Sequence, residues 1–435
     1  MKVSVIGLGK LGLPLAAVLA EAGNQVFAYD ASKALMSQLN NSTFHSSEPR
    51  LMGLLNNFRS NIIVTDTIHE AVLQSELTFI IVPTPSMQDG YFDNTLVIKV
   101  LKDISMSLKV KDGFHVIDVV STVMPGSCDA EFIPLLESHS GKVLNQEFGL
   151  CYNPEFIALG SVVKNMQSPD MHLIGASNAR SGEILERALK SVTGGNVPSC
   201  VMNLKEAELV KISVNNFVTA KISFANMLMQ ISDKLGGIDV DVVTEAIGLD
   251  SRIGKKYLRG GTSFGGPCFP RDTRAMSALM SQLELDPAIP EATSIVNQIQ
   301  NEFLVDKILE HIGTENKVSL IGFSYKPDTT VYEESTGFKL AKILIGMGKD
   351  VLIWEPLIDA SRLEDEPELV FTNNLMELAN YSVLILTREF ISFELELLVK
   401  HLDSHLILDP WRQLTQDQIK ALRAGITYIP LGRSI

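Results

Sequence analysis

Short apolar runs alternate with segments of helical spacing in the first third of the chain. Each run ends in glycine, proline or a polar residue, and the runs cover residues 3–6, 25–30, 77–82, 115–120 and 149–152. Continuous apolar runs of this length are typical of strands that are buried on both faces. Their alternation with helices predicts an α/β domain built on a parallel sheet.

The middle of the chain has a different pattern. Residues 204–235 keep helical spacing without proline or glycine, and Gly236-Gly237 then ends the run. A continuous helix over this stretch would be about 48 Å long. A shorter helix is expected from Asp239 to near Gly248, and Pro287 and Pro290 indicate a boundary. We therefore expect a central helical domain, whose long helix could also form a dimer interface.

The last third echoes the first. Residues 317–323 resemble residues 2–8, and residues 350–355 resemble residues 25–30. The other elements expected here are a helix at about 335–347 and strands at 383–386 and 406–408. The predicted fold class is α/β, with two Rossmann-like parallel-sheet domains joined by a central all-helical domain that contains one long helix.

Composition narrows the class of protein. The 435 residues carry a net charge of −14 and no long basic run, which argues against nucleic acid and anionic membrane as main partners. The four cysteines are scattered and predict neither a metal site nor a disulfide framework. The N-terminus leads directly into a strand without a signal peptide, and no apolar run is long enough to span a bilayer. We expect a soluble, cytoplasmic α/β enzyme.

A glycine-rich turn follows the first strand. Gly7-Leu8-Gly9-Lys10-Leu11-Gly12 lies between that strand and a helix, and Asp30 ends the second strand about 20 residues further on. The glycines permit a tight turn close to a pyrophosphate, at the positive end of a helix. Asp30 would bind the adenosine ribose and favour NAD over NADP. The alternative is a glycine turn that binds no ligand.

Polar residues follow the later strands. Thr122 and Glu155 come after two of them, and ligands bind at the carboxyl ends of such strands, so both are placed near the reactive end of a cofactor. Either could instead be a turn residue. On the long helix, Lys211 and Asn215 are four residues apart on one face and could hold an oxyanion. The alternative for Lys211 is a solvated surface lysine.

A single cysteine stands in a glycine- and proline-rich loop. The loop reads Ser263-Phe264-Gly265-Gly266-Pro267-Cys268-Phe269-Pro270-Arg271-Asp272. Cys268 could be a nucleophile whose protons or water are managed by Asp272. The alternative is a small buried thiol on an irregular connection. Upstream, Arg252 and Arg259 suit phosphate recognition, and Lys326 could hold a nucleotide diphosphate.

Taken together, the chain resembles the UDP-glucose/GDP-mannose 6-dehydrogenase family over essentially its whole length, and most of all the UDP-glucose enzymes. Several motifs occur in the order found in that family. They are the glycine turn, Pro83-Thr84-Pro85, Ser121-Thr122-Val123, Asn153-Pro154-Glu155-Phe156, Lys211 with Asn215, the Cys268 loop and Tyr325-Lys326.

The resemblance implies an NAD-binding domain at residues 1–198, a central helical domain for dimerisation and catalysis at 199–296, and a UDP-sugar-binding domain at 297–435. It implies a homodimer or higher oligomer. It also implies two successive oxidations of a sugar C6 hydroxymethyl group to a carboxylate, with two NAD. In this scheme Cys268 attacks the intermediate aldehyde, and a second hydride transfer gives a thioester.

The resemblance also assigns residue roles. Asp272 would assist proton transfer and hydrolysis, Lys211 and Asn215 would stabilise oxyanions, and Thr122 and Glu155 would act near the reacting carbon through water. The cofactor-binding positions are Gly7, Gly9, Lys10, Leu11, Gly12, Asp30, Pro83, Thr84, Pro85, Ser121, Thr122 and Arg271. The substrate-binding positions are Glu155, Phe156, Lys211, Asn215, Arg252, Arg259, Phe264, Gly265, Tyr325, Lys326 and Arg412, with Arg252 reaching the substrate of a neighbouring subunit.

Three positions depart from the family pattern. Leu159 stands where a second glutamate is frequent, and Arg271 replaces a frequent lysine. Glu333 stands where an arginine usually touches the cofactor, and an acid cannot replace an arginine at a phosphate. The contact must be rebuilt there, or the affinity for NAD is lower.

Other readings stay open. The sugar nucleotide could be GDP-mannose or a UDP-N-acetylhexosamine. A two-electron β-hydroxyacid dehydrogenase has a similar first domain, but it needs no thiol and no second Rossmann-like domain. A non-catalytic nucleotide-sugar sensor is supported only by Leu159 and Glu333.

Overall fold

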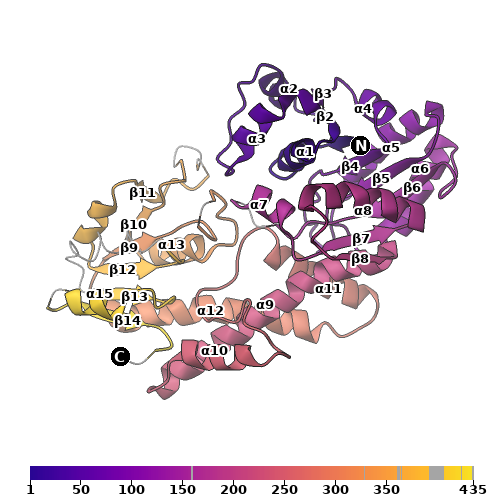
Figure 1. Cartoon of the computed structure of the whole chain (residues 1–435). Helices are drawn as coiled ribbons and strands as arrows, with labels where there is room; N and C mark the ends of the chain where they lie inside the picture. The colour runs from indigo at the N-terminus through magenta and orange to yellow at the C-terminus, as the bar shows by residue number, and fades with distance from the viewer. Residues whose placement is uncertain are drawn as a thin grey trace. The chain divides into compact units, whose positions relative to one another are not determined.

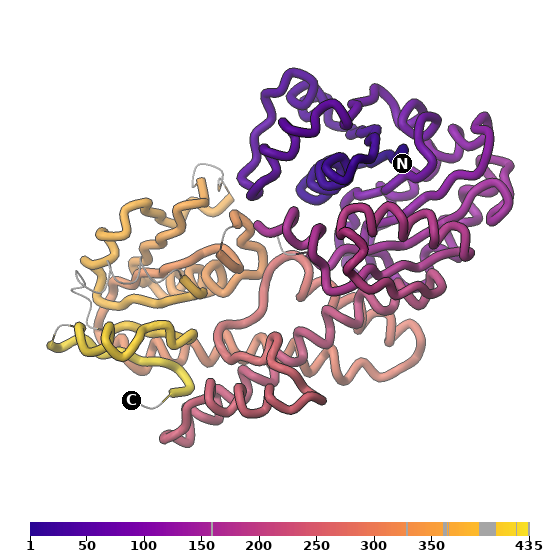
Figure 2. Tube along the Cα trace, viewed as in Figure 1, coloured from indigo at the N-terminus to yellow at the C-terminus, as the bar shows by residue number. Residues whose placement is uncertain are grey.

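A computed structural model of the chain describes residues 1–157, 160–327, 329–359, 363, 365–390, 406–422 and 424–433. The chain divides into two compact units, Met1–Ser213 and Val214–Ile435. Figure 1 labels their elements, and Figure 2 traces the backbone through each of them. The helix α9 (Leu204–Leu235) starts in the first unit and ends in the second.

The first unit is built on an eight-stranded sheet with the order β3-β2-β1-β4-β5-β6-β7-β8. Neighbouring strands are parallel except for β6 and β7. The strands are β1 (Lys2–Ile6), β2 (Gln25–Tyr29), β3 (Ile62–Val64), β4 (Leu77–Ile80), β5 (His115–Val119), β6 (Phe148–Tyr152), β7 (His172–Ala176) and β8 (Ser199–Met202).

Helices cover both faces of this sheet, as its continuous apolar runs require. Alternate strand residues point to opposite faces, so that Val116 of β5 packs in one core cluster and Ile117 in the other. One face carries α1 (Gly12–Glu21), α3 (Leu51–Asn57), α7 (Val162–Gln167) and α8 (Ala179–Thr193). The other carries α4 (Ile68–Gln74), α5 (Thr95–Val110) and α6 (Ile133–Ser140), while α2 (Lys33–Asn40) follows β2.

The second unit contains a six-stranded, wholly parallel sheet with the order β11-β10-β9-β12-β13-β14. Its central strand β9 is the segment that echoes β1 in sequence. The strands are β9 (Lys317–Ile321), β10 (Asp350–Trp354), β11 (Val370–Thr372), β12 (Val383–Leu386), β13 (Leu406–Asp409) and β14 (Thr427–Pro430).

Helices again pack against this sheet. The described helices of the unit, besides the end of α9, are α10 (Val240–Leu249), α11 (Phe269–Gln282), α12 (Ala288–Ile312), α13 (Thr336–Gly346) and α15 (Gln416–Ala421). Residues of α12 and α13 form one core with the sheet, and Leu378 and Leu414 pack on its other face. Pro287 is the N-cap of α12 and Pro290 lies in its first turn, where proline fits a helix.

The predicted fold class, with two Rossmann-like parallel sheets and one long helix in a central helical region, is confirmed. The predicted division into three domains stays a prediction. Near its first boundary, at residue 198, strand β8 begins and still belongs to the first sheet. Its second boundary, at residue 296, lies within α12. Within the described part of the chain, no helix combines the length and apolar character needed to cross a membrane.

Candidate active site

The glycine turn of the first unit leaves room beside its backbone. Gly7 has a φ of +93°, and a Cβ atom there would lie 2.1 Å from the carbonyl oxygen of Ile81. A Cβ atom at Gly12 would lie 1.8 Å from the carbonyl oxygen of Gly7, whereas a Cβ atom at Gly9 would have no neighbour within 4 Å. The outer glycines therefore permit close packing, and the middle one permits a ligand to approach.

The turn leads into a helix N-terminus that fits an anion. The N-cap of α1 is Leu11, whose side chain makes no capping hydrogen bond, and Lys10 beside it is exposed. The first N–H groups of a helix seek acceptors, and a pyrophosphate supplies them. These residues fit the diphosphate of NAD.

Asp30 is held at the carboxyl end of β2. Its carboxylate oxygens accept hydrogen bonds from the backbone N–H groups of Leu8 and Ser32, both at 2.7 Å. Each oxygen keeps a second lone pair, so the oriented carboxylate can still accept from ribose hydroxyls. Its negative charge would repel an additional phosphate at that position.

The loops after β4 and β5 are joined by side-chain hydrogen bonds. The Ser121 hydroxyl donates to the carbonyl oxygen of Val82 at 2.7 Å and accepts from the N–H of Val82 at 3.0 Å. The Thr84 hydroxyl donates to the carbonyl oxygen of Thr122 at 2.7 Å. The predicted positions Pro83-Thr84-Pro85, Ser121 and Thr122 are thus brought together at one edge of the sheet.

Lys211 is buried beside the predicted Glu155 motif. Its ammonium donates to the carbonyl oxygen of Glu155 at 2.6 Å and lies 4.5 Å from the centre of the Phe156 ring. The side chain of Lys211 is 6% exposed, so the interpretation of a solvated surface lysine is wrong. Burial raises the pKa of Glu155 to about 7, and the nearby charge of Lys211 opposes that rise.

In the second unit, Cys268 is exposed at the beginning of α11, where it is the N-cap residue. The alternative of a small buried thiol is therefore wrong. The N–H of Asp272, one turn later, donates to the carbonyl oxygen of Cys268 at 2.8 Å. Cys128 and Cys151 are buried and Cys200 is half-buried, so Cys268 is the most accessible thiol.

Asp272 is fully buried and its carboxylate has two side-chain partners. The Asn215 amide donates to one oxygen at 2.6 Å, and Nε of Arg271 donates to the other at 3.0 Å. The Asn216 amide donates to the backbone carbonyl oxygen of Asp272 at 2.9 Å. Four predicted residues, Asn215, Cys268, Arg271 and Asp272, thus lie in one hydrogen-bonded group.

The residues around the thiol loop are closely packed. Gly266 has a φ of +80°, and a Cβ atom there would lie 2.7 Å from the Tyr325 ring. Burial, with smaller effects of Cys268 and Tyr257, raises the pKa of Tyr325 to about 12, so its hydroxyl is a hydrogen-bond donor at neutral pH. The ammonium of Lys326 lies 5.8 Å from the centre of the Tyr325 ring.

The three predicted substrate arginines differ in their surroundings. Arg252 is exposed and pairs with Asp250. Arg259 is paired with Glu389 and donates to the carbonyl oxygen of Trp411 at 2.8 Å. Arg412 is buried, and its guanidinium donates to Asp241 and to three backbone carbonyl oxygens. A direct substrate contact of Arg412 stays a prediction.

Two departures from the family pattern have different outcomes. Glu333 is exposed, and its carbonyl oxygen accepts from the N–H of Gly266 at 2.9 Å. Its neighbour Glu334 pairs with Arg274 and Lys339. Leu159 lies outside the described residues.

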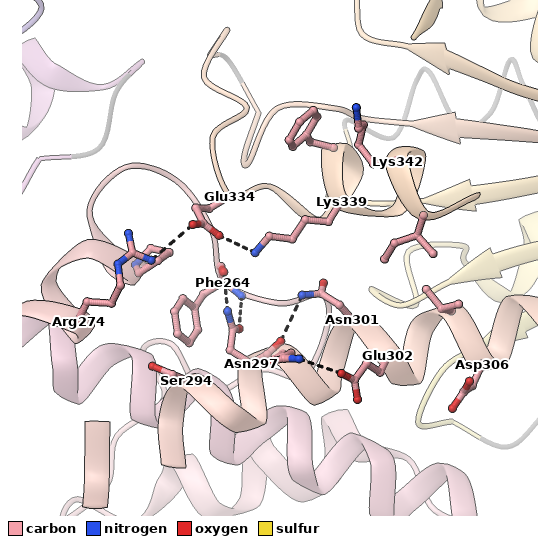
Figure 3. A pocket seen from close by; sticks show the side chains of 15 residues that line it. Phe264, Arg274, Ser294, Asn297, Asn301, Glu302, Asp306, Glu334, Lys339 and Lys342 are labelled. Carbon is pink, nitrogen blue, oxygen red and sulfur yellow. Dashed lines mark hydrogen bonds and ion pairs between the residues drawn. The ribbon is translucent and has the colours of Figure 1, made fainter. Parts of the chain in front are cut away.

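A cavity of about 800 Å³ adjoins the thiol loop. It lies among α11, α12 and α13, and its wall includes Phe264, four residues before Cys268 (Figure 3). Sequence reasoning missed three buried amides: Asn297 hydrogen-bonds to the loop at Phe264, and Asn226 and Gln300 hydrogen-bond to the residues just before the loop. The available signal was polar residues at core spacing on an otherwise apolar helix face.

Comparison with known proteins places this geometry in a family. Residues 1–193 match the model of the UDP-glucose/GDP-mannose dehydrogenase family, NAD binding domain, and residues 205–299 match the central domain of the same family. The chain belongs to the UDP-glucose/GDP-mannose dehydrogenase family. The NAD-binding fold and the residues around Gly9 and Asp30 accord with this family, whose dehydrogenases use NAD.

Relatives of the dehydrogenase family align over most of the chain. UDP-glucose 6-dehydrogenase AglM of Haloferax volcanii is 31% identical over 397 residues, which are 90% of this chain and 92% of that protein. GDP-mannose 6-dehydrogenase of Pseudomonas aeruginosa is 32% identical over 83% of each chain. The structure of a UDP-glucose dehydrogenase from Pyrobaculum islandicum has a TM-score of 0.88 at 29% identity, covering 99% of this chain and 98% of that one.

Proposed function

We propose that this protein oxidises the C6 hydroxymethyl group of a nucleotide sugar to a carboxylate with two NAD, and that the sugar nucleotide is UDP-glucose. The observation that carries the proposal is the exposed Cys268 thiol, one helical turn before the buried carboxylate of Asp272. An alcohol can lose a hydride directly, but an aldehyde must first add a nucleophile. A thiol meets that requirement and a two-electron dehydrogenase does not need one.

In the first oxidation, the C6 hydroxyl oxygen loses its proton and the C6 carbon loses a hydride, which leaves an aldehyde. NAD, when bound, would serve as the hydride acceptor. Residues Gly7, Gly9, Lys10, Leu11 and Gly12 would hold its diphosphate, with Asp30 on the ribose and Pro83, Thr84, Pro85, Ser121 and Arg271 as further contacts. The buried Lys211 ammonium and the Asn215 amide stabilise the developing alkoxide, and Thr122 and Glu155 act through water.

In the second oxidation, the Cys268 sulfur adds to the aldehyde carbon and the carbonyl oxygen becomes the hydroxyl of a thiohemiacetal. Loss of a second hydride and of that hydroxyl proton gives a thioester. Water then attacks the thioester carbon, the carbon–sulfur bond breaks, and the products are the carboxylate and the free thiol. The hydrogen bonds from Asn215 and Arg271 orient Asp272 to assist the proton transfers.

The second unit supplies further substrate contacts in this proposal. Phe264, Gly265, Tyr325, Lys326 and Arg259 bind the nucleotide sugar, and Phe156 does so from the first unit. Arg252 of one chain reaches the substrate of another, which is compatible with its long, exposed side chain. Arg412 acts by fixing the carbonyl oxygen of Gly260 at 2.6 Å. The reaction needs NAD and a reduced thiol, which favours the cytoplasm.

UDP-glucose is preferred over other sugar nucleotides because relatives named for it align over 90% or more of this chain. The GDP-mannose 6-dehydrogenases align over 83%. The competing β-hydroxyacid dehydrogenase function would use neither the Cys268 thiol nor the sheet of the second unit. A nucleotide-sugar sensor would bind without turnover.

The test is the yield of NADH per sugar. Limiting UDP-glucose, GDP-mannose and UDP-N-acetylhexosamines are each incubated with excess NAD, and two NADH are expected per UDP-glucose. One NADH per sugar would indicate a single oxidation, and none would favour the sensor. Cys268→Ser should abolish acid formation while leaving sugar-nucleotide binding intact, and unchanged turnover in that variant would remove Cys268 from the mechanism.

A further inference from the structure

The segment that leads to the thiol loop is hydrogen-bonded by side chains. The carbonyl oxygens of five consecutive residues, 260–264, each accept from a side chain. The donors are Arg412 to Gly260 at 2.6 Å, Gln300 to Gly261 at 2.6 Å, Asn226 to Thr262 at 3.2 Å, Thr336 to Ser263 at 3.3 Å and Asn297 to Phe264 at 2.9 Å.

Two of these donors also accept hydrogen bonds from the segment. Asn226 accepts from the N–H of Gly261 at 2.8 Å, and Asn297 accepts from the N–H of Phe264 at 2.8 Å. Figure 3 shows Asn297 reaching from α12 to the backbone of Phe264. Each amide therefore supplies the paired donor and acceptor that a neighbouring strand would give.

Residues 260 and 261 of this segment are packed too closely for a side chain. A Cβ atom at Gly260 would lie 2.9 Å from the carbonyl oxygen of Ala225, and one at Gly261 would lie 2.7 Å from the Trp411 ring. The side chains of Asn226 and Gln300 are fully buried, and Asn297 is 7% exposed. Water therefore has little access to replace a lost partner, and a buried carbonyl without one is unfavourable.

The five donors come from four separate parts of the second unit. Asn226 lies on α9, Gln300 and Asn297 on α12, Thr336 on α13, and Arg412 follows β13. They converge on the one segment whose next residues carry Cys268. A core that only needed its polar groups satisfied would not require such convergence.

We propose that Asn226, Asn297, Gln300, Thr336 and Arg412 are positioning residues, which hold the backbone of residues 260–264 and thereby place the Cys268 thiol. This inference rests on the proposed function in assigning the thiol to the second oxidation. The first oxidation does not use the thiol. Loss of a positioning residue therefore slows the second oxidation more than the first.

The test compares Asn297→Ala with Gln298→Ala. Gln298 is the adjacent residue on α12, and its amide bonds only to the exposed Glu302 among the contacts described for it. Thr336→Val is a second variant, because it keeps the side-chain shape and replaces the hydroxyl with a methyl group, which cannot donate a hydrogen bond. For each variant we would measure the Tm and the amide hydrogen exchange of residues 260–268. We would also measure the formation of NADH and of aldehyde with limiting UDP-glucose, with semicarbazide as the aldehyde trap.

In Asn297→Ala, exchange in residues 260–268 should accelerate while the rest of the second unit keeps its protection. The rate of the second oxidation should fall on the order of ten- to a hundredfold, since small misplacements of a reacting group have effects of that size. Trapped aldehyde should accumulate, and the NADH yield should fall from two toward one per sugar. Thr336→Val should give a smaller effect of the same kind, and Gln298→Ala should match the wild type.

Unchanged exchange with an NADH yield of two in Asn297→Ala would overturn the inference. Uniform loss of protection across the second unit, with both oxidations slowed equally, would also overturn it, because the amide would then be only structural. Exchange does not depend on the reaction. If Cys268→Ser still gives two NADH per sugar, the proposed function fails, and accelerated local exchange in Asn297→Ala would still establish the hold on the backbone.

Discussion

The carboxyl group of Glu155 is shifted into the neutral pH range by its surroundings. Its pKa rises from 4.5 to about 7 because burial disfavours the charged form more than Lys211 favours it. Between pH 4.5 and about pH 7, the folded protein therefore holds a proton that the unfolded chain has already released. The contribution of this group to stability is fully present below the lower value and is lost as the pH rises through the higher one.

Glu155→Gln should remove that pH dependence, because the amide does not ionise. The Tm of the variant minus that of the wild type should become more positive from about pH 5 to about pH 8, and should then stay constant at higher pH. Thermal unfolding followed by circular dichroism at several pH values measures this difference. A difference that does not change with pH would contradict the shifted pKa.

Asp30 should determine the choice of cofactor. Its carboxylate is fixed by two backbone N–H groups and would repel the 2′-phosphate of NADP, so the wild type should strongly prefer NAD. Asp30→Asn keeps one acceptor oxygen and removes the charge. The ratio of kcat/KM for NAD to that for NADP should fall by about tenfold, the effect of roughly 1.4 kcal/mol. Equal kcat/KM for both cofactors in the wild type would refute the ribose role.

At this scale the sequence predicted reactive residue types better than their partners. Cys268 and Asp272 stood out because a single cysteine lies in a glycine- and proline-rich loop, four residues before an aspartate. Nothing local to Lys211 indicated that its ammonium would bond to the backbone of Glu155, since that contact joins residues 56 positions apart. The role of Asn297 was equally hidden, because an asparagine on a helix usually faces solvent.

At the scale of elements, the strands and the long helix were predictable because their patterns are local. The strand expected at 77–82 ends at Ile80, and the long helix has the predicted bounds, Leu204–Leu235. The loop was predicted at residues 263–272, but α11 begins at Phe269, so Asp272 lies in the first turn of a helix. The path of the irregular segment 260–268 was not predictable. That path is set by side chains of helices far away in sequence.

Gly265 tests how tightly this segment is packed. A Cβ atom there would lie 2.3 Å from the carbonyl oxygen of Glu334, so Gly265→Ala should require a backbone shift. We expect a loss of about 1–3 kcal/mol in the free energy of unfolding, together with lower activity. Denaturant unfolding and steady-state assays measure both effects.

Gly346→Ala is the matched control for that substitution. Gly346 is the last residue of α13, and a Cβ atom there would meet nothing within 4 Å. Its stability should be unchanged or slightly higher, because alanine favours helices more than glycine does. Equal effects of the two substitutions would mean that the contact at Glu334 does not restrict residue 265.

At the scale of the whole molecule, α9 presents apolar side chains that the chain itself leaves exposed. Phe217, Phe224, Ile231 and Leu235 lie on one face of the helix at spacings of seven, seven and four residues, and they are 45% to 71% exposed. A row of exposed apolar side chains along one helix face is typical of an interaction surface. We propose that it is the surface through which two copies of this chain associate.

Substituting glutamate for both Phe224 and Ile231 should therefore reduce the molar mass in solution from that of a dimer or larger oligomer to that of one chain. Light scattering coupled to size-exclusion chromatography measures the mass. Val110→Glu is the control, because Val110 is an even more exposed apolar residue at the end of α5, and it should leave the mass unchanged. If Arg252 acts on the substrate of a neighbouring chain, the separated chains should also lose activity although each keeps its own Cys268. An oligomer that survives the double substitution would place the interface elsewhere.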